Sequence, residues 1–156
     1  FVNDAGERKI VAGGFSKISS LLISSDKWRL YIGDEQRGCV YAANIQEDGT
    51  LSDIYVHATL HLNTDFKIPG VLDMCLDSED RIYAATEIGI QTIRSYGLID
   101  VILANPNNET VNRIEIDNNG FLVAQTNGKV YKRKLCNKNR VEYNMQTEAT
   151  CCSYYD

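Results

Sequence analysis

The amino-acid sequence predicts an all-β fold that is built from repeats of one unit of antiparallel strands. Three stretches share the same order of apolar pairs, polar turns and short strands that end in small residues: 21–45, 74–94 and 114–135. They recur at intervals of about 40 to 50 residues. No stretch longer than a few residues follows the 3.6-residue period of a helix. Repeats of this length and strand content are typical of propeller blades, so we predict a partial β-propeller.

The first complete blade is predicted between residues 17 and 58. Its four strands are expected over 17–24, 28–33, 38–45 and 51–58. The turns between them are polar, and the last contains Asp48-Gly49, a pair that favours a tight hairpin. Before this blade, residues 1–12 are predicted to form a hairpin that contains Gly6 and belongs to a preceding blade.

Two further blades follow with the same strand order. The second is predicted over 71–104 and the third over 111–138, and the loops before them end in or contain proline. Residues 139–156 have no counterpart in the repeat and are predicted to be a C-terminal tail, in which 141–143 is a candidate outer strand. The propeller domain is therefore predicted to span residues 1–138, with about three four-stranded blades, which is half of a six-bladed ring.

A three-blade arc would expose strand edges and blade faces at both of its ends. We expect a second copy of the chain, or the missing N-terminal half of a longer chain, to cover them and close the ring. The sequence begins at Phe1 with no initiating Met, so we expect a truncated N-terminus. A soluble protein is expected, and the sequence leaves open whether it is cytoplasmic or exported.

Composition and residue spacing exclude several classes of function. Acidic residues outnumber basic residues by 21 to 16, and the densest basic run is 132–134, so no nucleic-acid partner is expected. No apolar stretch is long enough to cross a membrane. His57 and His61 have no cysteine at metal-ligand spacing and are predicted to be loop or rim residues. Cys39 and Cys75 lie in strand patterns and are predicted to be packing residues.

Four segments of the sequence carry a resemblance to a known family. They are FVNDAG at the start, SSDKWRLYIGDE, DMCLDSEDRIYAATEIGIQTI, and GKVYKRKL near the end. These segments resemble the senescence-marker/gluconolactonase family of six-bladed propellers, which includes regucalcin-like lactonases, and the last is similar to its bacterial members. The resemblance covers residues 1–136 and corresponds to the C-terminal half of such a domain.

The resemblance implies a metal site on the propeller axis, but this chain departs from it. Members of the family bind one divalent cation, usually calcium, which polarises a lactone carbonyl and activates the attacking water. The alignment places Ser19 where the family has a ligand Asn, and Leu72 where it has the carboxylate that serves as ligand and base. A shift by one residue brings Asp73 into that place, although in a strand it also reverses the face of the side chain unless a bulge restores it.

Two functions therefore remain open. The favoured one is a catalytically silent binding or scaffold module with a degenerate metal site, and no cofactor is expected for this chain alone. The alternative is a metal-dependent hydrolase of sugar lactones or related esters. In that case Asp73 would be the catalytic group, and Asp73 and Ser19 would bind Ca²⁺ or another divalent cation.

The ligand expected for either function is a small, sugar-like molecule. Arg113, at the start of the third inner strand, is a candidate ligand-binding residue. If its side chain faces the central channel, its fixed positive charge favours an anionic group over a cation.

Overall fold

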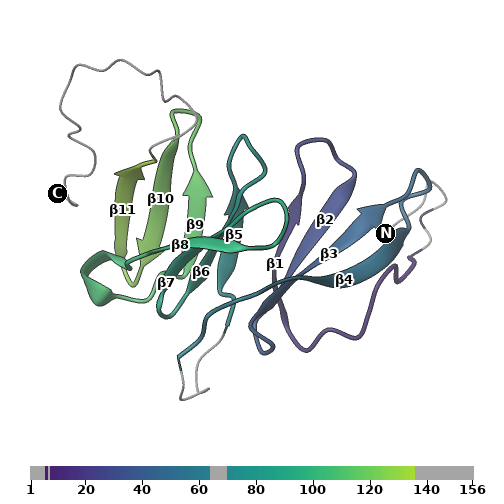
Figure 1. Ribbon diagram of the computed structural model, residues 1–156, viewed down its shortest axis with the longest axis horizontal. Helices are drawn as coiled ribbons and strands as arrows, with labels where there is room; N and C mark the ends of the chain where they lie inside the picture. The colour runs from purple at the N-terminus through teal and green to yellow at the C-terminus, as the bar shows by residue number, and fades with distance from the viewer. Residues whose placement is uncertain (1–5, 7, 64–69, 136–156) are drawn as a thin grey trace.

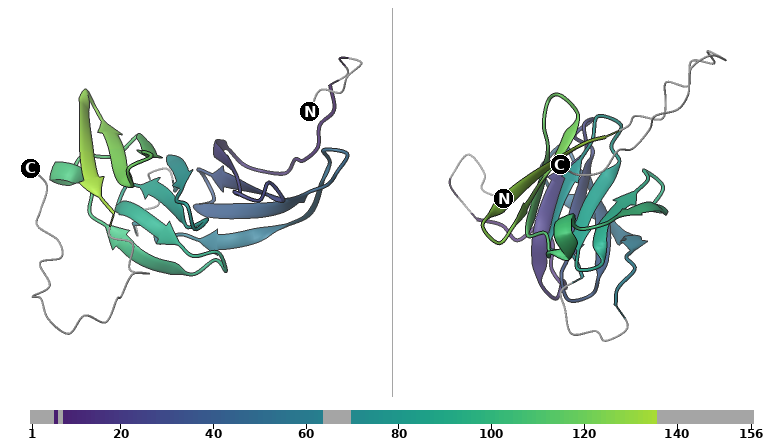
Figure 2. Two further views of the ribbon diagram at one scale, coloured as in Figure 1. Left: turned by 90° about the horizontal axis from the view of Figure 1, so that it is seen from above. Right: turned by 90° about the vertical axis from the view of Figure 1, so that its left-hand side faces the viewer.

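The computed structural model of the chain describes residues 6, 8–63 and 70–135. In this part of the chain all secondary structure except one short 3-10 turn is β-strand. The strands form three antiparallel sheets of four, four and three strands, which follow one another along an arc (Figures 1 and 2). The predicted all-β partial propeller with three blades is therefore confirmed. Among the same residues, no helix has the length and apolar character needed to cross a bilayer.

Each sheet is one blade, and its strands pair in the order in which they occur in the sequence. Blade 1 contains β1 (Ile18–Ile23), β2 (Arg29–Asp34), β3 (Cys39–Ile45) and β4 (Leu51–Thr59). Blade 2 contains β5 (Asp73–Leu76), β6 (Ile82–Thr86), β7 (Gly89–Ile93) and β8 (Ile99–Leu103). Blade 3, within the described residues, contains β9 (Arg113–Ile116), β10 (Phe121–Thr126) and β11 (Lys129–Lys134). The 3-10 turn η1 (Pro106–Asn108) lies between blades 2 and 3.

The predicted strands of blade 1 agree with the observed ones to within one residue at each end. Three other predictions fall wholly or mostly outside the described residues. They are the hairpin over 1–12, the outer strand over 141–143 and the tail over 139–156.

Two apolar cores hold adjacent blades together. The core between blades 1 and 2 contains Tyr31, Val40, Ala42, Ala58, Leu60, Val71, Met74, Ile82, Ala84 and Ile93. The core between blades 2 and 3 contains Cys75, Tyr83, Ala85, Ile90, Val111, Ile114, Leu122 and Ala124. Stacking stabilises the blades because a single sheet cannot bury its own apolar faces. Cys39 and Cys75 are buried free thiols, as expected of packing residues.

Each blade has one face that points along the arc toward the next blade. On this face, residues that pair across neighbouring strands form two rows, and the rows of the three blades occupy equivalent positions. The first row contains Ser20, Gly33 and Val40 in blade 1, Asp73, Ala85 and Ile90 in blade 2, and Arg113, Gln125 and Val130 in blade 3. The second row contains Leu22, Tyr31 and Ala42, then Cys75, Tyr83 and Thr92, then Glu115, Val123 and Lys132. The inner strands thus place Ser20, Asp73 and Arg113 at equivalent positions.

A buried carboxylate fixes the end of β2. Asp34 is fully buried and accepts hydrogen bonds from four backbone N–H groups, two from the segment before β1 and two from the β2–β3 turn. Burial by itself raises the pKa of this carboxyl, but the four donors outweigh burial and hold the pKa below its ordinary value. In blade 2 the Thr86 hydroxyl donates to the carbonyl of Gly89 at 2.6 Å. Both side chains cap strands.

The outer hairpin of blade 2 packs closely against the outer strand of blade 1. Gly97, in the β7–β8 turn, has a φ of +88°, and a Cβ atom there would lie 2.1 Å from the backbone oxygen of His57. The His57 ring lies 5.2 Å from the ring of Tyr31 and hydrogen-bonds to the backbone of Arg94. Its Nε2 atom is buried and has no hydrogen-bond partner among the described residues. His57 therefore belongs to strand β4 and to a junction between blades, and its predicted place in a loop or on the rim is wrong.

We expect the free energy of unfolding to fall as the pH is lowered from about 7.5 to about 5.5. Burial, together with the nearby charge of Arg29, lowers the pKa of His57 below 6.5. The unfolded chain therefore takes up a proton in this range that the folded chain does not. The limiting slope is about 1.4 kcal/mol per pH unit, and solvent around the half-buried ring reduces it.

Urea unfolding at the two pH values measures this change. His57→Gln should lose most of the pH dependence, whereas His61→Gln, which alters the exposed second histidine, should keep it. If His57→Gln kept the pH dependence of stability and His61→Gln lost it, a group other than His57 would be the one that titrates.

Candidate functional site

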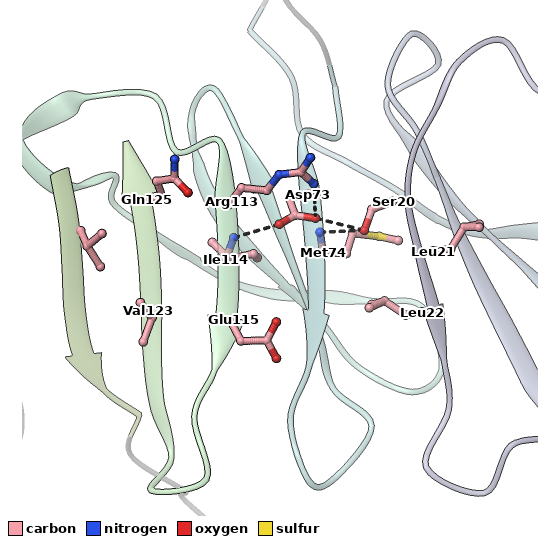
Figure 3. A pocket seen from close by; sticks show the side chains of 11 residues that line it. Ser20, Leu21, Leu22, Asp73, Met74, Arg113, Ile114, Glu115, Val123 and Gln125 are labelled. Atoms are coloured by element: carbon pink, nitrogen blue, oxygen red, sulfur yellow. Dashed lines mark hydrogen bonds and ion pairs between the residues drawn. The ribbon is translucent and has the colours of Figure 1, made fainter. Parts of the chain in front are cut away.

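The inner strands of the three blades line an open pocket on the concave side of the arc (Figure 3). The pocket has a volume of about 510 Å³. Its polar lining comes from β1, β5, β9 and β10, and its apolar lining includes Leu21, Val123 and Val130. Because β1, β5 and β9 carry equivalent positions of three blades, residues far apart in the sequence meet here.

Asp73 is the central polar residue of the pocket, and the protein itself occupies both of its carboxylate oxygens. Its Oδ2 atom accepts a hydrogen bond from the backbone N–H of Ile114 at 2.9 Å. Its Oδ1 atom accepts one from the Ser20 hydroxyl at 3.2 Å and lies 3.5 Å from Nη1 of Arg113. The Ser20 oxygen in turn accepts the backbone N–H of Met74 at 3.2 Å. These contacts tie β1, β5 and β9 together at the axis of the arc (Figure 3).

Arg113 contacts Asp73 only loosely. The guanidinium is 3.5 Å from the carboxylate, and 66% of the Arg113 side chain is exposed, whereas Asp73 is buried. Glu115 and Gln125 lie on the same face of blade 3 as Arg113 and also line the pocket. Among the described residues, the side chains of Glu115 and Gln125 make no hydrogen bond, and Arg113 has only its contact with Asp73.

The structure brings together two of the three residues that the sequence singles out. Asp73 and Arg113 are in contact, but Ser19 does not line the pocket. The pairing of β1 with β2 shifts between Ile18 and Ser20, so Ser19 is the extra residue of a bulge and its hydroxyl donates to the carbonyl of Gly33 at 3.4 Å. As a result Ser20, and not Ser19, reaches Asp73.

The structure shows which of Leu72 and Asp73 faces the pocket. Leu72 packs against the core between blades 2 and 3, and its backbone N–H donates to Ala85 at 2.9 Å. Asp73, one residue later, faces the pocket. Sequence reasoning missed Glu115, which alternates with Arg113 along one strand, and Gln125, whose place opposite Arg113 becomes visible only once the register is known.

The residues of this pocket do not fit a divalent cation. Each oxygen of Asp73 already accepts one hydrogen bond, so only part of the carboxylate's lone-pair capacity is left for a cation. The guanidinium of Arg113 also places a positive charge beside the carboxylate, and this charge repels a second cation. Across the described residues, no group of three or more His, Cys, Asp or Glu side chains has an arrangement that could hold a metal ion.

Neither a protein-family model nor a curated protein matches the chain. Solved structures do match it. A gluconolactonase of Xanthomonas campestris superposes with a TM-score of 0.67 at 18% identity, over 83% of this chain and 41% of that protein. A luciferin-regenerating enzyme superposes with a TM-score of 0.66 at 16% identity, over 81% of this chain and 43% of that protein. A virginiamycin B lyase of Staphylococcus aureus gives a TM-score of 0.51 at 16% identity, over 78% and 42% of the two chains.

The chain spans about two fifths of the length of these structures. Their names describe different reactions, so the common fold does not by itself assign an activity. What the superpositions establish is the architecture that the sequence resemblance implies. The chain has the fold of part of a gluconolactonase-like β-propeller.

Proposed function

We propose that the chain is part of a propeller that binds a ligand in its axial pocket without catalysing a reaction. This proposal rests on the contacts that the Asp73 carboxylate makes with the protein. A general base must have an oxygen free to take a proton from water or substrate, and a metal ligand must offer a lone pair. In this pocket Ile114 and Ser20 each take up one lone pair of the carboxylate, and the guanidinium of Arg113 lies beside it, where a cation would have to enter.

The same contacts give Asp73 a structural role in the pocket. The carboxylate joins the inner strands of three blades, so its loss would loosen the axis whether or not any chemistry takes place there. In this proposal, the remaining blades of the ring come from a second copy or from the rest of a longer chain, and a small polar molecule such as a sugar occupies the pocket.

A metal-dependent hydrolase of lactones or related esters is the second candidate. It is favoured by the gluconolactonase among the structures that share the fold and by the presence of two carboxylates, Asp73 and Glu115, in one pocket. Such an enzyme would require Arg113 to move away from Asp73 before a cation could enter.

Calcium titration and lactone hydrolysis separate the two functions. We expect isothermal titration calorimetry with CaCl₂ to show no saturable binding. We expect a sugar lactone to hydrolyse at the same rate with the protein as in buffer alone. Asp73→Asn should change neither result, and Asp48→Asn, at an exposed turn, is the matched control. Calcium-dependent turnover that disappears in Asp73→Asn and persists in Asp48→Asn would establish the hydrolase.

A further inference from the structure

We propose that Asn127 is a site of spontaneous deamidation, at which the side-chain amide is replaced by a carboxylate and part of the product is isoaspartate. The sequence contains two Asn-Gly pairs, Asn119-Gly120 and Asn127-Gly128, and each lies in a turn between two strands of blade 3. The two turns hold their backbones differently, and this difference favours reaction at Asn127. Asn127 does not line the axial pocket, and its reaction is independent of any ligand there.

Deamidation needs an asparagine side chain next to a free backbone N–H group. The backbone nitrogen of the following residue loses its proton and attacks the side-chain carbonyl carbon, Cγ. A new C–N bond forms, the bond from Cγ to the side-chain nitrogen breaks, and ammonia leaves. Water then opens the five-membered imide at either carbonyl, which gives aspartate or isoaspartate, and no other reactant is consumed. A following glycine favours the attack because it has no Cβ atom in the way and reaches more backbone conformations than other residues.

The N–H group of Gly128 is available for this attack. Thr126 and Lys129 are the last pair of the β10–β11 ladder, so Asn127 and Gly128 form a two-residue turn beyond it. Both turn residues are exposed, and the Gly128 N–H makes no hydrogen bond within the described residues. A Cβ atom on Gly128 would meet nothing within 4 Å. The turn therefore has room to change its conformation, and water can reach the imide.

The first Asn-Gly pair is held more tightly. The N–H of Gly120 donates to the backbone carbonyl of Asp117 at 2.9 Å, so it must give up this bond before it can attack. The Asp117 carboxylate also accepts the N–H groups of Asn119 and Phe121, each at 2.9 Å, and fixes the turn on both sides. Because several hydrogen bonds have to break first, we expect Asn119 to react about tenfold more slowly than Asn127.

Asn112 links the second turn to the strand that carries Arg113. Its side chain donates to Oδ1 of Asn127 at 3.3 Å, and its backbone N–H donates to the carbonyl of Gln125 at 2.8 Å. The side-chain donor lies at the oxygen on which negative charge develops during the attack, so it favours the reaction. The product carboxylate adds a negative charge at this end of the hairpin, and isoaspartate adds one atom to the backbone of the turn. Deamidation therefore changes the junction that leads into β9.

Peptide mapping of the full chain by mass spectrometry tests the site. The folded protein is incubated at mildly alkaline pH, where loss of the backbone proton is favoured, and is then digested with trypsin. Deamidation raises the mass of peptide 114–129 by one dalton, and fragment ions distinguish Asn119 from Asn127. We expect conversion about tenfold faster at Asn127 than at Asn119 in the folded chain, and rates within about twofold of each other in urea, where both turns are lost. Labelling with an isoaspartate methyltransferase should detect isoaspartate in the product.

Asp117→Ala is the matched variant, because it removes the side-chain acceptor of the first turn and leaves the second turn unchanged. It should speed conversion at Asn119 about threefold and leave the rate at Asn127 unaltered. Asn127→Gln should remove the fast conversion, because the longer side chain would have to form a six-membered ring. Equal rates at the two asparagines of the folded wild type, or a faster rate at Asn119, would overturn the assignment. Conversion of Asn127 in urea but not in the folded chain would also overturn it.

Discussion

Replacement of Asp34 by alanine is expected to lower the free energy of unfolding by about 4 kcal/mol. The carboxylate is fully buried and accepts four backbone N–H groups, at 2.8 to 3.3 Å, from Ser16, Lys17, Gln36 and Arg37. Alanine would remove the acceptor of these four donors. Each hydrogen bond to a charged group contributes about 1.5–3 kcal/mol, of which water restores part because the donor residues are exposed. Urea unfolding at pH 7 measures the loss.

Two variants separate the hydrogen bonds from the charge. Asp34→Asn keeps one carbonyl acceptor and should retain part of the stability, whereas Asp48→Ala removes an exposed turn carboxylate and should cost less than about 1 kcal/mol. The pKa of Asp34 is lowered in the folded chain, so its ionic contribution is present above about pH 4 and is lost as the pH falls further. If Asp34→Ala were as stable as Asp48→Ala, Asp34 would not be a structural cap.

Gly97→Ala is expected to lower the free energy of unfolding by about 3 kcal/mol. Two costs add at this position. The φ of +88° is unfavourable for alanine, and the new Cβ atom would lie 2.1 Å from the backbone oxygen of His57. The second cost arises because backbone cannot move aside as a flexible side chain can. The junction between the outer parts of blades 1 and 2 would therefore have to open.

Gly128→Ala provides the matched control for this prediction. Its φ of +80° is close to that of Gly97, but a Cβ atom there would meet nothing within 4 Å. We expect it to cost about 1 kcal/mol, the price of the backbone conformation alone. The difference between the two variants in urea unfolding then measures the contact between blades. If both variants lost the same free energy of unfolding, the close contact between blades 1 and 2 at Gly97 would contribute nothing to stability.

The sequence predicts the blades well because each blade is encoded locally. Apolar alternation and polar turns fix strands such as β2 and β3, and a hairpin joins each strand to the next within a sheet. The stacking order then follows from the order of the repeats along the chain. The family resemblance adds the architecture, which the superposed structures confirm.

The pocket is harder to predict because a shift of one residue in strand register changes which side chains line it. The sequence cannot tell whether Leu72 or Asp73 faces the axis, since a shift by one residue exchanges the two faces of a strand. The bulge at Ser19 changes the serine that reaches Asp73, and no residue pattern announces that bulge. The partnership of Arg113 with Asp73 joins two different blades, and the sequence contains no local signal for a contact over that separation.

The pairing of each strand with its neighbour in sequence has a consequence for how the fold comes apart. Because no described strand crosses from one sheet to another, cooperativity between blades depends on the two apolar cores and on hydrogen bonds between blades such as those of Asp73. Blade 2 is supported on both sides, while blades 1 and 3 are each supported by the described chain on one side. Local opening should therefore begin at either end of the arc and progress inward, as in a one-dimensional stack of repeats, with the middle blade the last to lose its structure.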